Sequence, residues 1–257
     1  MIVARDLAPA QLDSVLGRTS PVLKLVISIV WLLGLATTVS PGPPLVIAAV
    51  AVVAGLTLGR IPRRDLARAL APLWLAAIGL ATFNALFGAA NSDTTAEVVA
   101  QIGPFRLTLA ALAVGIGLGL RVAAIGAVGA VFALTTDSTR LVDSLVQQGH
   151  LPERFAYGAL AAYGAVPRFS EDLATLRQAR RIRGLRGGWH PRLLVSLLVL
   201  AIRHGDRMAI AMDARGFGTG PRSLYREVRW GRLDFVVGLG AAMTLLAALV
   251  GGARLSL

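Results

Sequence analysis

The sequence predicts an all-α, polytopic membrane protein with about five transmembrane helices and a cytoplasmic helical platform. Composition is the first observation behind this prediction: 55% of the 257 residues are hydrophobic and only 16% are charged, whereas soluble domains carry roughly 25% charged residues. The second is a set of apolar runs close to the length of about 20 residues that a helix needs to cross the hydrocarbon core. The runs are Val22–Val39, Pro43–Gly59, Ala69–Ala90, Leu107–Leu134 and Phe235–Val250.

The first run begins beside Lys24, whose long side chain can reach the membrane interface. Arg5, Arg18 and Lys24 stand before or at the start of an apolar segment, so a cleavable signal peptide is an alternative interpretation. The later apolar runs, and the turn-like residues that separate the first two runs, favour an uncleaved first helix.

The third and fourth runs contain polar residues and helix breakers. Pro72 and Asn84 interrupt the third run, and Arg121 lies near the middle of the fourth. We expect Arg121 to be structural, buried against Asn84 or carbonyl groups, with a pore charge as the alternative. Three glycines of the fourth run, Gly115, Gly117 and Gly119, predict close helix packing.

The distribution of basic residues predicts the orientation in the membrane. The loop between the second and third runs carries Arg60, Arg63, Arg64 and Arg68, whereas the loop between the first and second runs carries no charge. Since Lys and Arg are enriched in cytoplasmic loops, we expect a multi-pass protein of the cytoplasmic membrane with a cytoplasmic N-terminus. The net charge of +12 then fits an anionic membrane face or an acidic partner better than nucleic acid.

The long segment before the last run is the unusual part of the chain. We expect three regions: transmembrane helices over 1–134, a cytoplasmic or interfacial helical region over 135–234, and a C-terminal transmembrane helix over 235–257. Shorter helices are expected over Ser138–Gln148 and Pro152–Gly164, and no segment shows a strand pattern. Two longer helices follow, with apolar residues at intervals of three and four; their stripe includes Leu173, Leu176, Leu194, Leu197, Leu198 and Ile202.

The ends of these two helices resemble each other. Ile182-Arg183-Gly184 ends the first and Ala214-Arg215-Gly216 ends the second. An arginine in a last turn is favoured by the helix dipole, and the glycine after it can take the left-handed conformation that ends a helix. An ordinary helix terminus has the same composition, but a pair of such ends predicts docking into two equivalent grooves of a partner.

These residues identify the chain as similar to the T component of energy-coupling factor (ECF) importers, the EcfT/CbiQ family. Ala214-Arg215-Gly216 resembles the second of the family's two short arginine motifs, and Ile182-Arg183-Gly184 resembles the first, with isoleucine where alanine is usual. The segment Gly17–Leu25 and Val166-Pro167-Arg168-Phe169 also resemble the family.

The resemblance implies a non-catalytic membrane scaffold without a cofactor, whose two arginine-tipped coupling helices dock on a pair of ABC ATPases. The apolar stripe would contact a separate substrate-binding S component, which captures a vitamin, a vitamin precursor or a transition metal. Consistent with this, the sequence has no Gly-x-x-x-x-Gly-Lys-Ser/Thr phosphate loop, and its apolar runs contain no Asp or Glu.

An intramembrane enzyme and a membrane channel or lipid-binding protein are the competing classes of function. An intramembrane enzyme is disfavoured, since the apolar runs lack acidic and histidine residues, and His150, His190 and His204 are too scattered to predict a metal site. A membrane channel or lipid-binding structural protein without ATPase partners is the alternative. The arginines around Arg183 are expected to attract anionic membrane lipid.

Overall fold

The computed structural model describes residues 9–38, 40–92, 97–102, 105–185, 190–219 and 226–255. The chain divides into two compact units. The membrane unit comprises Leu7–Asp137 and Arg229–Leu257, and the platform unit is Ser138–Val228 together with Met1–Asp6, of which Met1–Asp6 lie outside the described residues.

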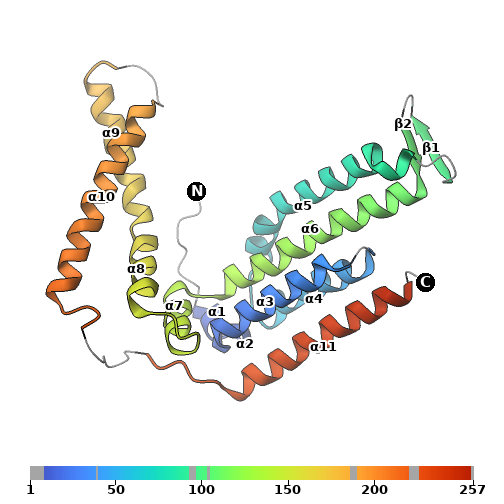
Figure 1. Ribbon diagram of the computed structural model, residues 1–257, viewed down its shortest axis with the longest axis horizontal. Coiled ribbons are helices and arrows are strands. Elements are labelled where there is room, and N and C mark those ends of the chain that lie inside the picture. Colours follow the sequence, from blue (N-terminus) through green and yellow to red (C-terminus); the bar gives the residue numbers. More distant parts are fainter. Residues whose placement is uncertain are drawn as a thin grey trace. The chain divides into compact units, whose positions relative to one another are not determined.

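The membrane unit contains a helix at each of the five predicted apolar runs (Figure 1). These are α3 (Pro21–Ala36), α4 (Gly42–Thr57), α5 (Arg63–Phe87), α6 (Leu109–Thr135) and α11 (Arg232–Leu255). Within the described ranges, three segments are long and apolar enough to cross a membrane: Arg63–Asn91, Leu109–Thr135 and Arg232–Gly252. The helices α3 and α4 have 16 residues each, which is about 24 Å of helix. The all-α, polytopic fold class is therefore confirmed.

Large apolar side chains face outward on these helices. Leu33 on α3 is 64% exposed, and Leu75 on α5 and Phe235 on α11 are 73% exposed each. A soluble protein rarely leaves such a surface open to water, whereas hydrocarbon solvates it. The inner faces form a core of buried residues from all five helices and from Ile61 between α4 and α5: Trp31, Leu35, Ile47, Ala51, Ile61, Leu66, Leu70, Ala124, Ala127, Val128 and Ala248.

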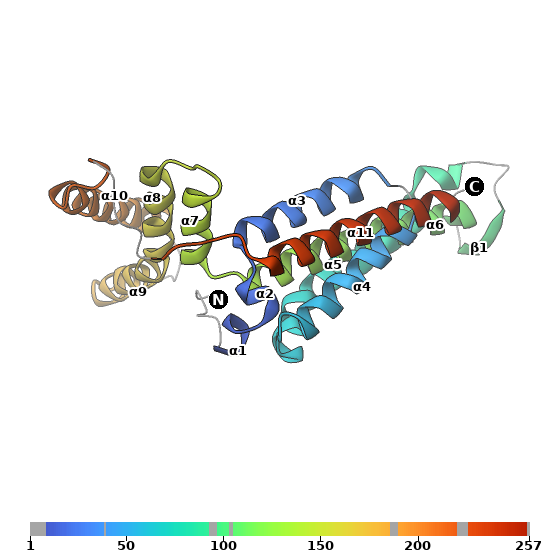
Figure 2. The same cartoon turned by 90° about the horizontal axis from the view of Figure 1, so that it is seen from below.

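Helices α5 and α6 lie side by side in both views (Figures 1 and 2). Glycines of α6 allow this approach: a Cβ on Gly115 would lie 2.6 Å from the carbonyl oxygen of Ala81, and one on Gly119 would lie 2.8 Å from that of Ala77. The predicted role in close packing is confirmed for Gly115 and Gly119. Asn84 donates to the carbonyl oxygen of Leu80 within α5 at 3.1 Å. Among the described residues, the buried Nε of Arg121 has no hydrogen-bond partner, so the structural role of Arg121 stays a prediction.

The absence of strands was a wrong prediction. After the short 3₁₀ helix η1 (Ala89–Ser92), strands β1 (Val98–Ile102) and β2 (Phe105–Thr108) pair antiparallel between α5 and α6. The β-branched residues of β1 favour this conformation, but a hairpin of nine strand residues is short beside the apolar runs around it. Because β2 extends to Thr108, α6 begins at Leu109 rather than at Leu107, where the predicted apolar run begins. Thr108 caps the helix by accepting a hydrogen bond from the backbone N–H of Ala111.

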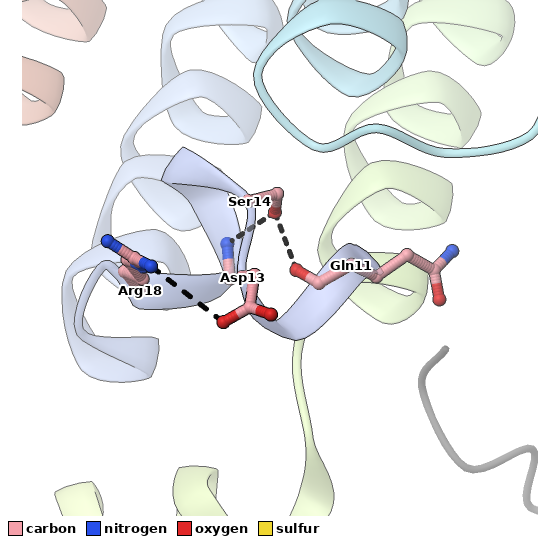
Figure 3. A network of polar contacts seen from close by, with 5 residues as sticks. Gln11, Asp13, Ser14 and Arg18 are labelled. Carbon is pink, nitrogen blue, oxygen red and sulfur yellow. Dashed lines mark hydrogen bonds and ion pairs between the residues drawn. The ribbon is translucent and has the colours of Figure 1, made fainter. Parts of the chain in front are cut away.

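Two short helices precede the first long one. These are α1 (Pro9–Leu12) and α2 (Val15–Arg18). Ser14 lies between them, where its Oγ donates to the carbonyl oxygen of Gln11 at 2.6 Å and accepts from the backbone N–H of Gly17 at 2.9 Å (Figure 3). The exposed side chains of Asp13 and Arg18 approach to 3.8 Å.

Buried polar bonds join α3 to the last helices of the membrane unit. Lys24 is only 6% exposed, and its Nζ donates to the carbonyl oxygen of Thr135 at 2.7 Å. The Lys24 side chain therefore stays inside the unit. Its position in the sequence predicted that it would reach outward to the membrane interface, and this prediction is wrong. Near the same end, the buried carboxylate of Asp234 accepts from the backbone N–H groups of Ser20 and Gly231, at 2.7 Å each.

The platform unit consists of α7 (Ser138–Gln147), α8 (Glu153–Gly164), α9 (Val166–Ile182) and α10 (Pro191–Ala214). All four were predicted. Pro191 occupies the first turn of α10, where its missing N–H costs nothing. The helices α9 and α10 pack against each other and run in opposite directions (Figure 1).

Candidate functional site

The two arginine motifs have the same backbone structure. Arg183 and Arg215 are the C-cap residues of α9 and α10, and the glycine after each has a left-handed φ, +70° at Gly184 and +69° at Gly216. These values confirm the glycine caps predicted from the sequence.

Two hydrogen bonds repeat in the two loops. At the first, Gly184 N–H donates to the carbonyl oxygen of Arg181 at 3.0 Å, and Leu185 N–H to that of Arg180 at 3.2 Å. At the second, Gly216 N–H donates to the carbonyl oxygen of Asp213 at 2.9 Å, and Phe217 N–H to that of Met212 at 3.0 Å. Both pairs follow the Schellman pattern of helix termination. We call the two loops tip 1 (Ile182–Leu185) and tip 2 (Ala214–Thr219).

The motif residues of both tips face outward within the platform unit. Ile182 is 87% exposed, and Arg183, Gly184, Ala214 and Arg215 are also exposed, with Gly216 half-buried. A guanidinium at this position adds its charge to the negative end of the helix dipole, which stabilises the helix. Its planar fork can also pair bidentately with a carboxylate.

The tips lie at opposite ends of the α9–α10 pair (Figure 1). Since the two helices are antiparallel and each tip follows a C-terminus, the 24 residues of α10 separate the tips by about 36 Å along its axis. One groove cannot accept both arginines. The arrangement fits two separate sites on a partner.

Tip 2 is held by α8. Arg154 donates from Nη2 to the carbonyl oxygen of Gly218 at 3.2 Å, and the ring of Tyr157 lies edge-on to that of Phe217, with centroids 6.5 Å apart. Tyr157 in turn donates from its hydroxyl to Oδ1 of the buried Asp143 on α7, at 2.9 Å. Burial and the adjacent Asp143 raise the pKa of Tyr157 to about 12, so the phenol stays protonated as a donor.

The chain that follows tip 2 is held by α7. Gln147 donates to the carbonyl oxygen of Arg226 at 2.7 Å and accepts from the backbone N–H of Val228 at 2.8 Å, while Gln148 donates to the carbonyl oxygen of Val228 at 3.2 Å. Tip 1 differs. Among the residues that the structure describes, no side chain of another helix bonds to Arg183, Gly184 or Leu185.

Sequence reasoning missed these supports of tip 2. Arg154, Tyr157 and Asp143 come from helices 60 to 75 residues before the motif, and no spacing pattern links them to it. The glycine at 218 is the one local signal, since its φ is +78° and a Cβ there would collide with the Arg154 guanidinium.

The residues of the predicted apolar stripe differ in exposure. Leu194, Leu198 and Ile202 of α10 are exposed, at 49%, 60% and 55%, whereas Leu173, Leu176 and Leu197 are half-buried. Further along α10, its C-terminal half from Ala201 to Met212 lines a cavity of about 270 Å³ with α8 and α9, in which Phe169 meets His204 edge-on at 6.4 Å between centroids. The exposed leucines and isoleucine are therefore the part of the stripe that is open to a partner.

The described part of the chain contains no group of three or more His, Cys, Asp or Glu side chains that could hold a metal ion.

These features define a multi-pass helical membrane protein that carries two arginine-tipped helices outside its apolar bundle. Residues 13–225 match the CbiQ family, described as cobalt transport protein, and the chain belongs to this family. The resemblance predicted from the arginine motifs is confirmed.

Relatives with assigned names agree with the family. The chain is 27% identical over 249 residues to the energy-coupling factor transporter transmembrane protein EcfT of Heliobacterium modesticaldum, covering 88% of this chain and 89% of the relative. It is 27% identical over 243 residues to EcfT of Bacillus selenitireducens, covering 88% of each. A shorter alignment of 150 residues, 28% identical, joins it to EcfT of Listeria innocua, with 52% of this chain and 57% of the relative.

Proposed function

We propose that this chain is the transmembrane scaffold subunit, or T component, of an ECF-type ABC importer, and that it couples ATP hydrolysis by partner ATPases to substrate uptake. The observation that carries the proposal is the repeated structure of the two tips, with an exposed arginine before a left-handed glycine at the end of two packed helices. Alignment with relatives named EcfT over 88% of the chain supports it.

In this proposal each tip binds one ATPase subunit. Arg183 docks on one subunit of the ATPase pair and Arg215 on the other, because about 36 Å of helix separates the tips. When the ATPases close on ATP and reopen, the two grooves move and carry α9 and α10 with them. The carboxylates that receive the arginines belong to the ATPases, and the chain itself carries out no catalysis.

The exposed apolar residues of α10 serve the second partner. The S component is a membrane protein that holds the vitamin, vitamin precursor or transition metal. It contacts the exposed Leu194, Leu198 and Ile202 and the half-buried Leu173, Leu176 and Leu197. The N-terminus is on the cytoplasmic side, with the ATPases, as the arginine-rich loop before α5 predicts.

The test is to replace the two tip arginines, separately and together, in the chain co-expressed with its ATPases and S component. Arg183→Ala and Arg215→Ala should each weaken ATPase association, because truncation of one partner in a buried charge pair costs about 2 to 5 kcal/mol. Arg177→Ala, an exposed arginine of α9 away from its tip, is the matched control and should leave association unchanged.

Co-purification of the ATPases in detergent and uptake of radiolabelled substrate are the measurements. If the double variant keeps both, the proposal is wrong. If the unmodified chain purifies without any ATPase, the alternative of a channel or lipid-binding structural protein is favoured instead.

A further inference from the structure

A half-enclosed cavity of about 380 Å³ lies inside the membrane unit. Its walls come from α2, α3, α4, α6 and α11. The volume is within the range of about 300 to 1,000 Å³ that is usual for sites of small ligands. No part of the coupling tips contributes to it, because every residue of the lining belongs to the membrane unit.

The lining is chemically apolar. Most of its residues are Val, Leu, Ile, Ala and Phe. Its polar side chains already donate to main-chain carbonyl oxygens: Ser28 to Lys24, Trp31 to Ala241, Thr135 to Val131, Thr244 to Gly240, and Lys24 to Thr135. Water is stable in a buried cavity when it finds two to four polar partners, and apolar cavities stay dry or take apolar ligands. A hydrocarbon ligand therefore fits this lining better than a polar one.

The length of the cavity corresponds to one leaflet of a bilayer. Along α11 its lining extends from Leu233 to Thr244, about 16 Å of helix, and half of the hydrocarbon core is about 15 Å. It starts at the end of the unit where α3 and α11 begin and α6 ends, with Lys24 and Thr135 in its wall, and it ends near the middle of α11.

Charge at the starting end matches an anionic head group. Arg18, two residues after the lining residue Leu16, and Arg232, next to the lining residue Leu233, both have exposed side chains, and the exposed carboxylate of Asp13 lies 3.8 Å from Arg18. Arginines beside a membrane surface attract anionic lipid. On the outer face of α11, Phe235 and Leu239 are 73% and 65% exposed, so lipid surrounds the helix that forms one wall.

We propose that this cavity binds one acyl chain of an anionic phospholipid from the leaflet on the side of the chain's N-terminus. The acyl chain fills the space between the helices, and the head group lies beside Arg18 and Arg232. The inference depends only on the membrane unit, so it holds or fails independently of the coupling role proposed above.

Trp31 provides a probe, because its ring is part of the cavity wall and only 8% of it is exposed. In a variant with W74F, W189F and W230F, Trp31 is the one remaining tryptophan of the four in the sequence. Titration of this variant in detergent with a phospholipid brominated in its acyl chain should quench Trp31 fluorescence to a plateau at about one lipid per chain. Brominated phosphatidylglycerol should reach the plateau at lower concentration than brominated phosphatidylcholine.

Glycine substitutions provide the matched pair of variants. A Cβ on the lining residue Gly240 meets no atom within 4 Å, and the same is true of Gly79 on α5, a helix that contributes no residue to the lining. Gly240→Leu should fill the cavity and abolish the saturable quenching, whereas Gly79→Leu should keep it. Ala54→Leu, from the α4 wall, is a second filling variant with the same expected loss.

Three results would overturn the proposal. The first is quenching that rises without a plateau, and the second is equal quenching in the filled and control variants. The third comes from native mass spectrometry of the unmodified chain: either no phospholipid is retained, or a second copy of the protein is bound instead of a phospholipid. A plateau that is the same for the two head groups would refute the anionic part. Because the mass measurement uses the unmodified chain, it decides the matter even where a filled variant does not fold.

Discussion

Gly184 and Gly216 occupy the same position in the two tips, with nearly the same φ, yet their surroundings differ. A Cβ on Gly184 meets no atom within 4 Å, whereas a Cβ on Gly216 lies 3.0 Å from Oγ1 of Thr219. Thr219 donates from that hydroxyl to the carbonyl oxygen of Gly216 at 2.8 Å. Tip 1 therefore relies on its own backbone, and tip 2 is a loop with internal side-chain bonds.

Alanine at either glycine should disturb its arginine through the backbone. The left-handed conformation costs an L-residue about 1 to 2 kcal/mol, so Gly184→Ala and Gly216→Ala should both reorient the tip and weaken ATPase association. The effect should be larger at Gly216, where the close Thr219 hydroxyl adds to the strain. Affinity of the purified complexes measures it, with Gly205→Ala, a helical glycine with open space around it, as the control. Equal affinity in all three variants contradicts the prediction.

Removal of the Arg154 side chain should affect tip 2 alone. Arg154→Met keeps most of the aliphatic stem and loses the bond to Gly218. Because that bond is exposed, we expect a cost of about 1 kcal/mol, which corresponds to roughly a fivefold loss of affinity for the ATPases. Arg168→Met, at an exposed position of α9, is the control. In the double variant with Arg215→Ala the Arg154 effect should disappear, since the residue acts through the tip; a loss that simply adds would contradict this.

The phenol of Tyr157 should ionise at a higher pH than an ordinary tyrosine. Burial and Asp143 raise its pKa to about 12 from an ordinary value near 10. Since the folded protein favours the neutral phenol, this contribution to stability is fully present below pH 10 and is lost as the pH rises towards 12. Absorbance of tyrosinate against pH should show one of the three tyrosines ionising near pH 12, and Tyr157→Phe should remove that step. A titration of the folded protein without a step near pH 12 would refute the prediction.

The sequence predicts the periodic parts of this fold and misses the contacts between distant segments. Composition and spacing predict the five apolar helices and the four platform helices, and the glycines of both tips predict a left-handed backbone conformation. Lys24 shows the limit: its position at the start of α3 predicts an outward side chain, but its partner is a carbonyl group 111 residues later. The support of tip 2 by Arg154 and Tyr157 is missed for the same reason, because it depends on how α8 packs rather than on any local pattern.

Asp234 should be a principal source of stability in the membrane unit. Each oxygen of its buried carboxylate accepts one backbone N–H, from Ser20 before α3 and from Gly231 before α11, at 2.7 Å. Asparagine has a single acceptor oxygen, so Asp234→Asn must leave one of the two N–H groups facing an amide donor. An unsatisfied buried donor costs about 1 to 3 kcal/mol. Thermal unfolding of the purified chain in detergent should therefore show a lower midpoint for this variant.

The matched control is Asp13→Asn, which keeps the same chemical change at an exposed position. The carboxylate of Asp13 is 3.8 Å from Arg18 and its side chain is 73% exposed; such surface pairs contribute at most about 1 kcal/mol. Its midpoint should stay close to that of the unmodified chain. If the two variants unfold at the same temperature, the bonds of Asp234 do not hold the starts of α3 and α11 together, and the stability of this end must come from the apolar core around Trp31 and Leu35.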